Sequence, residues 1–384
     1  MLEPKKRFSE FKDPLQQSRL GDIAIFLKGK GISKNDIVIN GINECIRYGE
    51  LYTTYGELIS KVSSKTNISK SDSILSEIND IIIPSSGESQ LDIAKASCVL
   101  VSGVILGGDL NIIRMRANGV FFSYYLNSAK KIEIAKIAQG NSVVHLYSRQ
   151  LSNLIVNYPS PPEQQKIASF LSTVDEKINL LKKQLFLLEQ YKKGVMQKIF
   201  SREIRFKDEN GNEFPEWELI TLGECLDYEQ PNNYLVDNTE YSDTYPTPVV
   251  TAGKTFILGY TNEKNGIFAN NLPVIIFDDF TTSSQFVTFP FKAKSSAMKI
   301  LKAKPLCSVK FLFEALQMIK YEVGGHGRHW ISVFSKLEIL IPNHLEQQKI
   351  ASFLSSFDEK IDKTQDQISK MELWKKGLLQ QMFV

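Results

Sequence analysis

Only two groups of residues in the 384-residue chain have types and spacing that suit metal binding or hydrolysis. His326 and His329 could supply two metal ligands, but no third ligand stands at a recognisable spacing. Asp278-Asp279 with Lys292 and Lys294 could form the carboxylate–lysine set that cleaves a phosphodiester bond. Because paired acids at a strand end more often form hydrogen bonds within a loop, we expect neither a metal site nor a catalytic site.

The motifs of common catalytic and nucleotide-binding sites are absent from the sequence. Gly253-Lys-Thr255 is similar to the end of a phosphate-binding loop, but Pro248 stands where that loop requires glycine. The sequence contains no G-x-G-x-x-G after a strand, no H-E-x-x-H, no G-x-S-x-G and no Asn-Pro-Pro-aromatic tetrapeptide of amino-methyltransferases. We therefore expect no cofactor in this chain.

Many of the remaining polar residues have the chemistry of contacts with nucleic acid. Arginine can bind guanine through two hydrogen bonds, aspartate can accept from cytosine, and lysine and serine suit phosphate. In the first half of the chain the candidates are Lys28, Lys30, Arg47, Tyr48, Ser85, Ser86, Arg114 and Arg116. In the second half they are Asp278, Asp279, Thr281, Thr282, Ser283, Lys292, Lys294, Lys299, Arg328 and His329. Each group taken alone also fits an ordinary polar turn.

The distribution of charge is more informative than its total. The net charge is +3, which does not by itself indicate a nucleic-acid partner. Residues 280–313, however, contain six lysines and no acidic residue. Such a stripe can follow a row of phosphates, and a solvated lysine face is the alternative.

Length and composition indicate a protein of two or three domains. The four cysteines lie far apart without a C-x-x-C motif, which favours a reducing compartment such as the cytoplasm over a disulfide scaffold. The first twelve residues are too polar for a signal peptide, and the longest apolar stretch, 96–108, is too short to span a bilayer.

The strongest pattern in the sequence is an internal repeat. The segment Glu163–Ser172 recurs unchanged as Glu346–Ser355. Apolar residues in both copies follow steps of three and four, which predicts a stripe along a helix of about 40 residues, roughly 60 Å long. The expected helix-pairing residues are Ile167, Phe170, Val174, Ile178, Leu181, Leu185, Ile350, Phe353, Phe357, Ile361 and Ile368. Because so narrow an apolar stripe is not stable alone in water, it needs a partner helix. We expect the two copies to pair with each other in an antiparallel arrangement, and an intermolecular coiled coil is the alternative.

Capping signals mark the start of both expected helices. Ser160 and Asn343 are expected N-caps, and Glu163 and Glu346, three residues further on, would complete capping boxes. The two mid-helix glycines, Gly194 and Gly377, each weaken a helix by about 1 kcal/mol and could mark a bend or a close approach.

The segments before the two helices predict mixed α/β domains. Both contain Phe-Lys-Asp, at 11–13 and 206–208, followed by Leu-Gly and an acid, at 20–22 and 222–224. Strands are expected at 37–39, 80–83, 97–106, 249–251, 274–277 and 286–289, and helices at 121–138 and 309–320. The fold class is therefore α+β, with a domain at 1–159, a helix at 160–200, a domain at 201–342 and a helix at 343–384.

These features resemble the specificity subunit of Type I restriction–modification systems. The resemblance covers the whole chain: two diverged domains are each followed by a near-identical helix. Its most specific segments are Pro161-Pro-Glu163-Gln-Gln-Lys-Ile-Ala168 and Glu346-Gln-Gln-Lys-Ile-Ala351. The second copy departs from this pattern, because Asn343-His-Leu replaces the adjacent prolines. Segments 277–280 and 294–301 also look like parts of such subunits.

The resemblance implies a division of labour. Each domain would be a target-recognition domain that reads one half of a split, asymmetric sequence in double-stranded DNA. The paired helices would form a spacer that fixes the gap between the halves, and they would dock two modification subunits. Those subunits would bind S-adenosylmethionine and methylate adenine, and restriction subunits that use ATP and magnesium would join them. The chain itself would be a non-catalytic DNA-binding subunit.

Two other classes of function stay open on the residues alone. One is a duplicated coiled-coil scaffold whose domains bind protein or glycan. The other is a solitary nuclease or methyltransferase, which would show activity as the purified chain. Salt-dependent DNA binding separates the scaffold from the DNA-reading interpretation, since phosphate contacts release counterions.

Overall fold

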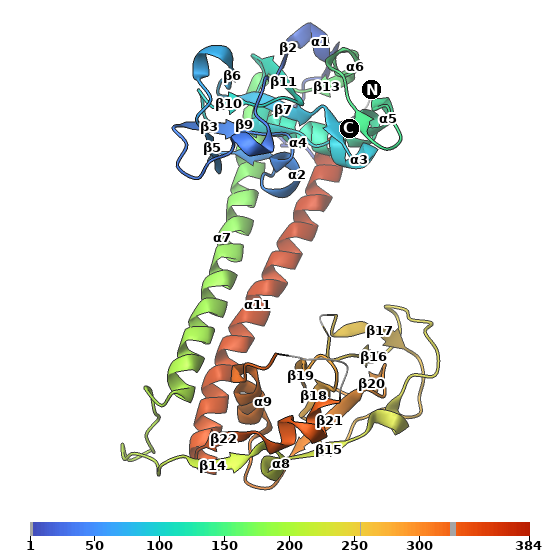
Figure 1. Cartoon of the computed structure of the whole chain (residues 1–384). Helices are drawn as coiled ribbons and strands as arrows, with labels where there is room; N and C mark the ends of the chain where they lie inside the picture. Colours follow the sequence, from blue (N-terminus) through green and yellow to red (C-terminus); the bar gives the residue numbers. More distant parts are fainter. Residues whose placement is uncertain (1–2, 254, 323–327) are drawn as a thin grey trace. The chain divides into compact units, whose positions relative to one another are not determined.

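The computed structural model describes residues 3–253, 255–322 and 328–384. The chain divides into two compact units, unit 1 with residues 1–182 and 366–384, and unit 2 with residues 183–365. Both boundaries lie inside the long helices α7 (Pro161–Phe200) and α11 (His344–Met382), which are drawn green and red in Figure 1. Each unit therefore contains a part of both predicted helices.

Unit 1 is built on two sheets. Five strands form the central sheet in the order β2 (Ala24–Lys28), β11 (Leu110–Met115), β7 (Asp80–Pro84), β9 (Ser97–Val99) and β4 (Leu58–Ile59). A second sheet has the order β5 (Ser64–Thr66), β3 (Asn43–Ile46), β10 (Ile105–Leu106) and β6 (Ile74–Leu75). Two strand pairs complete the unit, β1 (Gln16–Arg19) with β13 (Ile155–Tyr158) and β8 (Ser86–Gly87) with β12 (Val144–His145).

Short helices surround these sheets. They are α1 (Leu20–Ile23), α2 (Glu50–Thr53), α3 (Gln90–Ile93), α4 (Gly119–Ser128), α5 (Lys131–Ile137) and α6 (Ser148–Ser152), with 3-10 turns at Lys34–Asp36 and Lys70–Asp72. Side chains of the central strand β7 alternate between two cores, as the period of a strand requires. Ile81 and Ile83 pack with Phe121 of α4, whereas Ile82 packs with Ile46 of the second sheet.

Unit 2 repeats this layered arrangement with different loops. Its central sheet has the order β15 (Leu226–Glu229), β21 (Met298–Ala303), β18 (Val274–Asp278) and β19 (Ser284–Val287). The other strands form the sheet β17 (Ile257–Thr261), β16 (Thr247–Val250) and β20 (Lys292–Ala293), and the pair β14 (Glu218–Thr221) with β22 (Glu338–Ile341). The helices are α8 (Leu222–Cys225), α9 (Val309–Met318) and α10 (His329–Ser332), with 3-10 turns at Pro231–Tyr234 and Phe334–Lys336.

The central strand of unit 2 also alternates between two cores. Ile275 and Phe277 pack with Phe311 of α9, whereas Val274 and Ile276 pack against the three-stranded sheet. Equivalent helices, α4 in unit 1 and α9 in unit 2, therefore cover the corresponding faces of the two central sheets. This is the arrangement expected from a duplicated unit.

The predicted elements are confirmed in kind, and several are corrected in extent. The strand expected at 97–106 is two strands, β9 and β10, and the helix expected at 121–138 is α4 and α5. The strand expected at 37–39 is absent, since only an isolated bridge joins Ile37 to Thr66. The predicted correspondence of Leu20-Gly-Asp22 with Leu222-Gly-Glu224 is confirmed, because these residues form α1 and α8.

The capping boxes predicted at the long helices do not form. Asn343 caps α11 as expected, because its side-chain oxygen accepts from the N–H of Glu346 at 2.9 Å. The carboxylates of Glu163 and Glu346 are buried and instead bind arginines, Arg7 and Arg205, that lie about 150 residues earlier in the chain. Local sequence cannot reveal partners at that separation.

Neither mid-helix glycine is required by a close neighbour. A Cβ atom built at Gly194 or Gly377 meets nothing within 4 Å. Gly194→Ala and Gly377→Ala are therefore each expected to raise the free energy of unfolding by about 0.5–1 kcal/mol, measured by urea denaturation. Gly29→Ala is the contrast and should lower the free energy of unfolding, because the added Cβ would lie 1.8 Å from the carbonyl oxygen of Gly107. Loss of stability in both helix variants would mean that the helices need glycine at these positions.

Candidate nucleic-acid interface

In unit 1 most of the predicted contact residues lie together where the strands of both sheets end. The loops 28–31, 46–49, 84–88 and 106–110, called here the unit 1 loop edge, are joined through their backbones. Hydrogen bonds run from the N–H of Gly29 to the carbonyl of Leu110 at 3.0 Å, Gly107 to Ile46 at 2.9 Å, Ser85 to Asp109 at 2.7 Å, and Gly108 to Gly31 at 2.6 Å. Residues distant in sequence thus form one surface.

Positive charge is available on the unit 1 loop edge. Lys28 and Lys30 are exposed, and no ion pair engages either of them in the described part of the chain. Tyr48 is exposed, and Arg47 is half-buried with an Nε that has no hydrogen-bond partner. Ser86 contacts His145 at 3.3 Å. The structure therefore brings together six predicted residues, Lys28, Lys30, Arg47, Tyr48, Ser85 and Ser86.

Arg114 and Arg116 are not part of this edge, since they lie near the opposite end of β11. The guanidinium of Arg114 binds both carboxylate oxygens of the buried Asp80 at 2.9 and 2.8 Å, and Glu77 at 2.5 Å. These contacts, the hydrogen bond with Asp80 above all, raise the pKa of Arg114. Arg114 thus holds β11 to β7, and its predicted contact with a base stays a prediction. Arg116 is exposed and lines an open groove of about 1080 Å³.

In unit 2 the candidates gather around the turn between β18 and β19. Asp279 connects this turn, residues 278–284, to two other segments, 294–298 and 328–330, and the three together are called here the unit 2 loop edge. Its N–H donates to the carbonyl of Ala297 at 3.1 Å, and its own carbonyl accepts from the N–H of His329 at 3.0 Å. Its Oδ1 accepts from the N–H of Trp330 at 2.8 Å. The turn is consequently fixed to two neighbouring loops.

Four residues predicted to contact DNA are buried inside unit 2. Asp279 and Lys299, 0% and 1% exposed as side chains, form an ion pair at 3.1 Å. Lys292 is paired with Glu263 at 2.5 Å, and His329 contacts Tyr321 at 3.2 Å. Buried charges cannot reach a phosphate without breaking these contacts, so the structure assigns Asp279, Lys292, Lys299 and His329 to the interior.

The expected lysine stripe at 280–313 is largely neutralised by acids from elsewhere in unit 2. Lys302 pairs with Glu229, Lys304 with Asp227 at 3.4 Å, and Lys310 with Glu314 at 2.6 Å. Lys294 stays exposed, and the described residues offer it no ion pair, only the ring of Tyr241 at 5.9 Å. Thr281, Ser283 and Arg328 are also exposed on this edge, and Thr282 and Asp278 are half-buried.

The groups considered for catalysis are not assembled. Lys292 faces Glu263 rather than Asp278 and Asp279, and His326 and Lys254 lie outside the described residues. Within residues 3–253, 255–322 and 328–384, no three His, Cys, Asp or Glu side chains are grouped to hold a metal ion. The same residues include no helix with the length and apolarity to cross a membrane.

Ion pairs between α7 and α11 fix the helices to each other inside both units. In unit 1, Lys375 of α11 pairs with Asp175 of α7 at 2.6 Å. In unit 2, Lys192 of α7 pairs with Asp358 of α11 at 2.7 Å. Asp175 corresponds to Asp358 in the repeat, and Lys192 corresponds to Lys375. The same pair of positions therefore forms both contacts, with the aspartate on α7 in unit 1 and on α11 in unit 2, as antiparallel pairing requires.

The domains are attached to these same ion pairs. In unit 1, the hydroxyl of Tyr124 in α4 donates to Asp175 at 2.6 Å, and burial followed by this hydrogen bond raises the pKa of Tyr124. In unit 2, Glu314 in α9 binds Lys192 at 2.9 Å. Burial lowers the pKa of Lys192, but the bonds with Asp358 and Glu314 outweigh it and the net pKa is raised.

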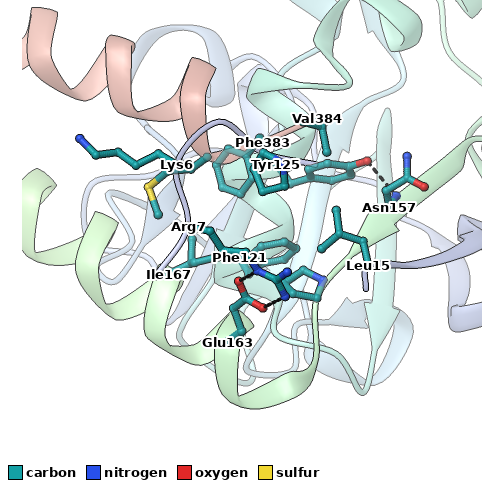
Figure 2. Close-up of a pocket in the computed structure, with 13 residues that line it drawn as sticks. Lys6, Arg7, Leu15, Phe121, Tyr125, Asn157, Glu163, Ile167, Phe383 and Val384 are labelled. Atoms are coloured by element: carbon teal, nitrogen blue, oxygen red, sulfur yellow. Dashed lines mark hydrogen bonds and ion pairs between the residues drawn. The ribbon is translucent and has the colours of Figure 1, made fainter. Parts of the chain in front are cut away.

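A second repeated contact lies at the start of each long helix. Figure 2 shows Arg7 of the N-terminal segment bound to Glu163 through two hydrogen bonds of 2.7 Å. Beside them Phe383, at the end of the chain, packs against Phe121 and Tyr125 with ring centroids 5.5 and 5.9 Å apart, around a cavity of about 20 Å³.

In unit 2 the equivalent contact is made by Arg205. It binds Glu346 at 2.9 Å, and the ring N–H of Trp217 donates to the same carboxylate at 3.1 Å. Phe8 and Phe206, the next residues along the chain, contact Phe170 and Phe353. Phe206 therefore corresponds to Phe8, and the predicted match of 206–208 with 11–13 is wrong. The shared Arg-Phe dipeptide was the available signal.

The predicted helix-pairing residues are all buried or half-buried, and some of them, such as Ile167 and Ile350, belong to the cores of the domains. The fully buried ones are Ile167, Val174, Ile178, Leu181, Ile350, Phe357 and Ile368, and the half-buried ones are Phe170, Leu185, Phe353 and Ile361. Leu171 and Leu354, each 0% exposed, were missed although they occupy equivalent places in the repeat. Asp175, Lys192, Asp358 and Lys375 were also missed, although the repeat preserves them.

The chain matches a known protein family over most of its length. The family is described as "Type I restriction modification DNA specificity domain", and it matches residues 12–190 and 215–373. The chain is 48% identical over 155 residues to the Type I restriction enzyme EcoR124I/EcoR124II specificity subunit of Escherichia coli, a match that spans only 38% of each protein. It is 24% identical to the MjaVIII specificity subunit of Methanocaldococcus jannaschii, over 94% of this chain and 90% of that protein.

A solved structure shows the same fold. The Type I restriction–modification S subunit from M. genitalium matches with a TM-score of 0.71 and covers 100% of this chain and 99% of its own. The sequence identity is 16%, so the likeness concerns the fold. It agrees with the predicted α+β class, two mixed domains and a spacer of long helices.

Arg114→Ala is expected to lower the free energy of unfolding by about 3 kcal/mol, because it leaves the buried Asp80 without its counter-charge. Arg116→Ala, two residues further along and exposed, is the matched control and should change stability by less than about 0.5 kcal/mol. Chemical denaturation measures both. Equal stability of the two variants would show that the Arg114 ion pair does not hold these strands together.

Asp358→Asn should lower the free energy of unfolding by about 2 kcal/mol, because Lys192 and Lys310 would then share Glu314. The expected loss is smaller than for a fully buried pair, since 33% of the Asp358 side chain is exposed. Asp366→Asn breaks an exposed pair with Lys370 on the same helix and should have almost no effect. Thermal unfolding of both variants tests this, and indistinguishable midpoints would contradict it.

Proposed function

The chain belongs to the family of Type I restriction–modification specificity subunits, and from this premise we propose that each unit reads one half of a split DNA target. The observation that carries the proposal is the contrast between the two loop edges and the shared frame behind them. The contacts of Asp175 and Asp358 with lysine recur in both units, whereas the loops at the strand ends differ in length and chemistry. Two unlike surfaces on one frame suit two unlike half-sites, so the target is asymmetric.

The exposed groups on each edge suit a first, unspecific contact with DNA. Lys28 and Lys30 in unit 1 and Lys294 and Arg328 in unit 2 are exposed cations, and the described residues provide no acid that pairs with them. Such groups neutralise phosphates and position a protein on the duplex, while neighbouring polar side chains read base edges. Tyr48, Arg47, Thr281 and Ser283 are the candidates for that second role.

The two long helices act in this proposal as the spacer between the half-sites. Support comes from the pairing inside each unit, where apolar residues and the repeated aspartate–lysine pair fix α7 to α11. A helix of 40 residues is about 60 Å long, which limits the gap to fewer than about 18 base pairs.

We further propose that the helices dock two modification subunits, which a restriction subunit can join. Support comes from large apolar side chains on α7 and α11 that stay substantially exposed. In unit 2 these are Phe186, Leu187 and Tyr191, each more than half exposed, and in unit 1 they are Leu180, Leu373 and Trp374. Leu187 and Tyr191, four residues apart, share one face of α7, and exposed apolar surface of this kind suits a protein interface.

The chemistry in this proposal belongs to the partner subunits. The chain contributes recognition and no cofactor, whereas modification subunits bind S-adenosylmethionine and methylate adenine, and restriction subunits use ATP and magnesium. Support is the sequence itself, which has no methyltransferase tetrapeptide and no phosphate-binding loop.

The function is tested by exchanging residues 20–154 for the same segment of a relative with a different target. This exchange retains Arg7 and the pair β1 with β13, and a relative that also has tyrosine at position 124 keeps the contact with Asp175. Methylated adenines are then mapped in a host genome that supplies the modification subunits. We expect one half-site to change while the other half-site and the gap stay the same. A motif changed in both halves, or no dependence of methylation on this chain, would refute the proposal.

Lys28→Ala combined with Lys30→Ala should weaken DNA binding and lower the slope of log affinity against log salt by about one for each phosphate that the variant no longer neutralises. Lys5→Ala combined with Lys12→Ala is the matched control, because it removes the same charge from exposed positions outside the loop edge. Titration of labelled DNA at several salt concentrations measures the slope. Identical slopes for the two double variants would remove the unit 1 loop edge from the DNA surface.

A further inference from the structure

The turn between β18 and β19 presents a large apolar side chain in otherwise polar surroundings. Phe280 is 41% exposed, while Phe277, three residues earlier, is completely buried. The residues that follow, Thr281 to Ser283, are polar and at least partly exposed. Phe280 belongs to neither of the hydrophobic clusters described in unit 2, so its exposed surface suits a contact outside the chain.

The backbone of this turn is held in one conformation. The Oδ1 of Asp278 accepts from the N–H of Phe280 at 2.9 Å and from the N–H of Thr281 at 2.8 Å. Thr282 has a φ of 59°, a left-handed conformation that a threonine rarely adopts. Asp278 also donates its own N–H to the carbonyl of Ser283 at 2.8 Å. These contacts fix the direction in which Phe280 leaves the sheet.

A buried ion pair connects the turn to the central sheet of unit 2. Asp279 is paired with Lys299, and the N–H of Trp330 donates to its carboxylate. Burying such a pair costs desolvation energy that an apolar pair would not, so the gain to the protein is a defined position rather than stability. In this interpretation Asp279 and Lys299 are positioning residues for the residue beside them in the chain, Phe280.

Two exposed cations lie on the segments that are hydrogen-bonded to this turn. Arg328 precedes His329, whose N–H binds Asp279, and Lys294 lies in the segment that Ala297 connects to Asp279. Both cations are exposed, and neither has an ion-pair partner in the parts of unit 2 that the structure describes. Cations that can bind phosphates, on the same loop edge as an exposed apolar group, suit the major groove, where the thymine methyl group is the apolar feature.

We propose that Phe280 contacts the 5-methyl group of a thymine in the half-site that unit 2 reads, an inference that rests on the function proposed above. The equivalent turn of unit 1 has different chemistry. Ser85 occupies the place of Asp279, since its N–H binds Asp109 and its carbonyl accepts from Leu146, and the turn continues through α3. Only the half-site that unit 2 reads should therefore depend on a thymine methyl group through this turn.

The test uses the complex of this chain with its modification subunits and duplexes that carry the mapped target. Each thymine is replaced in turn by deoxyuridine, which removes only the methyl group. For the wild-type complex, one replacement in the unit 2 half-site should lower kcat/KM for methylation about fourfold, the effect of losing one buried methyl group. Phe280→Ala should lower kcat/KM on the thymine duplex to a similar extent and abolish the difference between thymine and uracil.

Leu306→Ala is the matched control. Leu306 is 76% exposed and follows the far end of β21, so its loss removes apolar surface away from the turn. This variant should retain the fourfold preference. If Phe280→Ala also retains it, or if no thymine of that half-site responds to replacement, the inference is overturned while a bipartite methylation pattern still supports the proposed function. If the wild-type complex methylates no bipartite site, the proposed function fails and this inference fails with it.

Discussion

The salt bridge between an aspartate on one long helix and a lysine on the other is the interaction on which the rest of the structure depends. It is formed by Asp175 with Lys375 in unit 1 and by Asp358 with Lys192 in unit 2. Because the two helices are copies of one sequence and pair antiparallel, a single pair of residue types produces the contact twice. Narrow apolar stripes alone would not fix the register of the two helices, since many registers bury a similar apolar area. The salt bridge makes any other register of the two helices less stable, because a shift would separate the aspartate from the lysine.

This contact also determines how the domains are attached. Tyr124 of α4 and Glu314 of α9 occupy equivalent places and bind opposite members of the salt bridge, the first Asp175 and the second Lys192. The additional acid in unit 2 is balanced by Lys310. The frame therefore tolerates substitution as long as charge is compensated. At the other end of the sheets no such constraint applies, and Ser85 with Asn111 in unit 1 stand where unit 2 has the ion pair of Asp279 with Lys299. The two units thus differ in chemistry where the proposed recognition takes place.

Sequence reasoning succeeded where the signal was local or repeated. Helical periodicity gave both long helices and their buried face, and apolar runs gave the strands β7 and β18, because these patterns need no knowledge of distant partners. It failed where a distant residue decides the role of a side chain. Glu163 looked like part of a capping box but binds Arg7, and the ion pair of Arg114 with Asp80 could not be seen in the sequence. The acid-free lysine segment looked like a phosphate stripe, yet Glu229, Glu263 and Asp279 reach it from other strands and loops.

The central claim is that the paired helices set the distance between two reading surfaces, and inserting one helical turn at equivalent places tests it most directly. Four residues added after Lys182 in α7 and four after Gln365 in α11 would lengthen both helices by about 6 Å, or roughly two base pairs. Methylated adenines mapped in the presence of the modification subunits should then show the same two half-sites with a longer gap between them. An unchanged gap with the same half-sites would contradict the account.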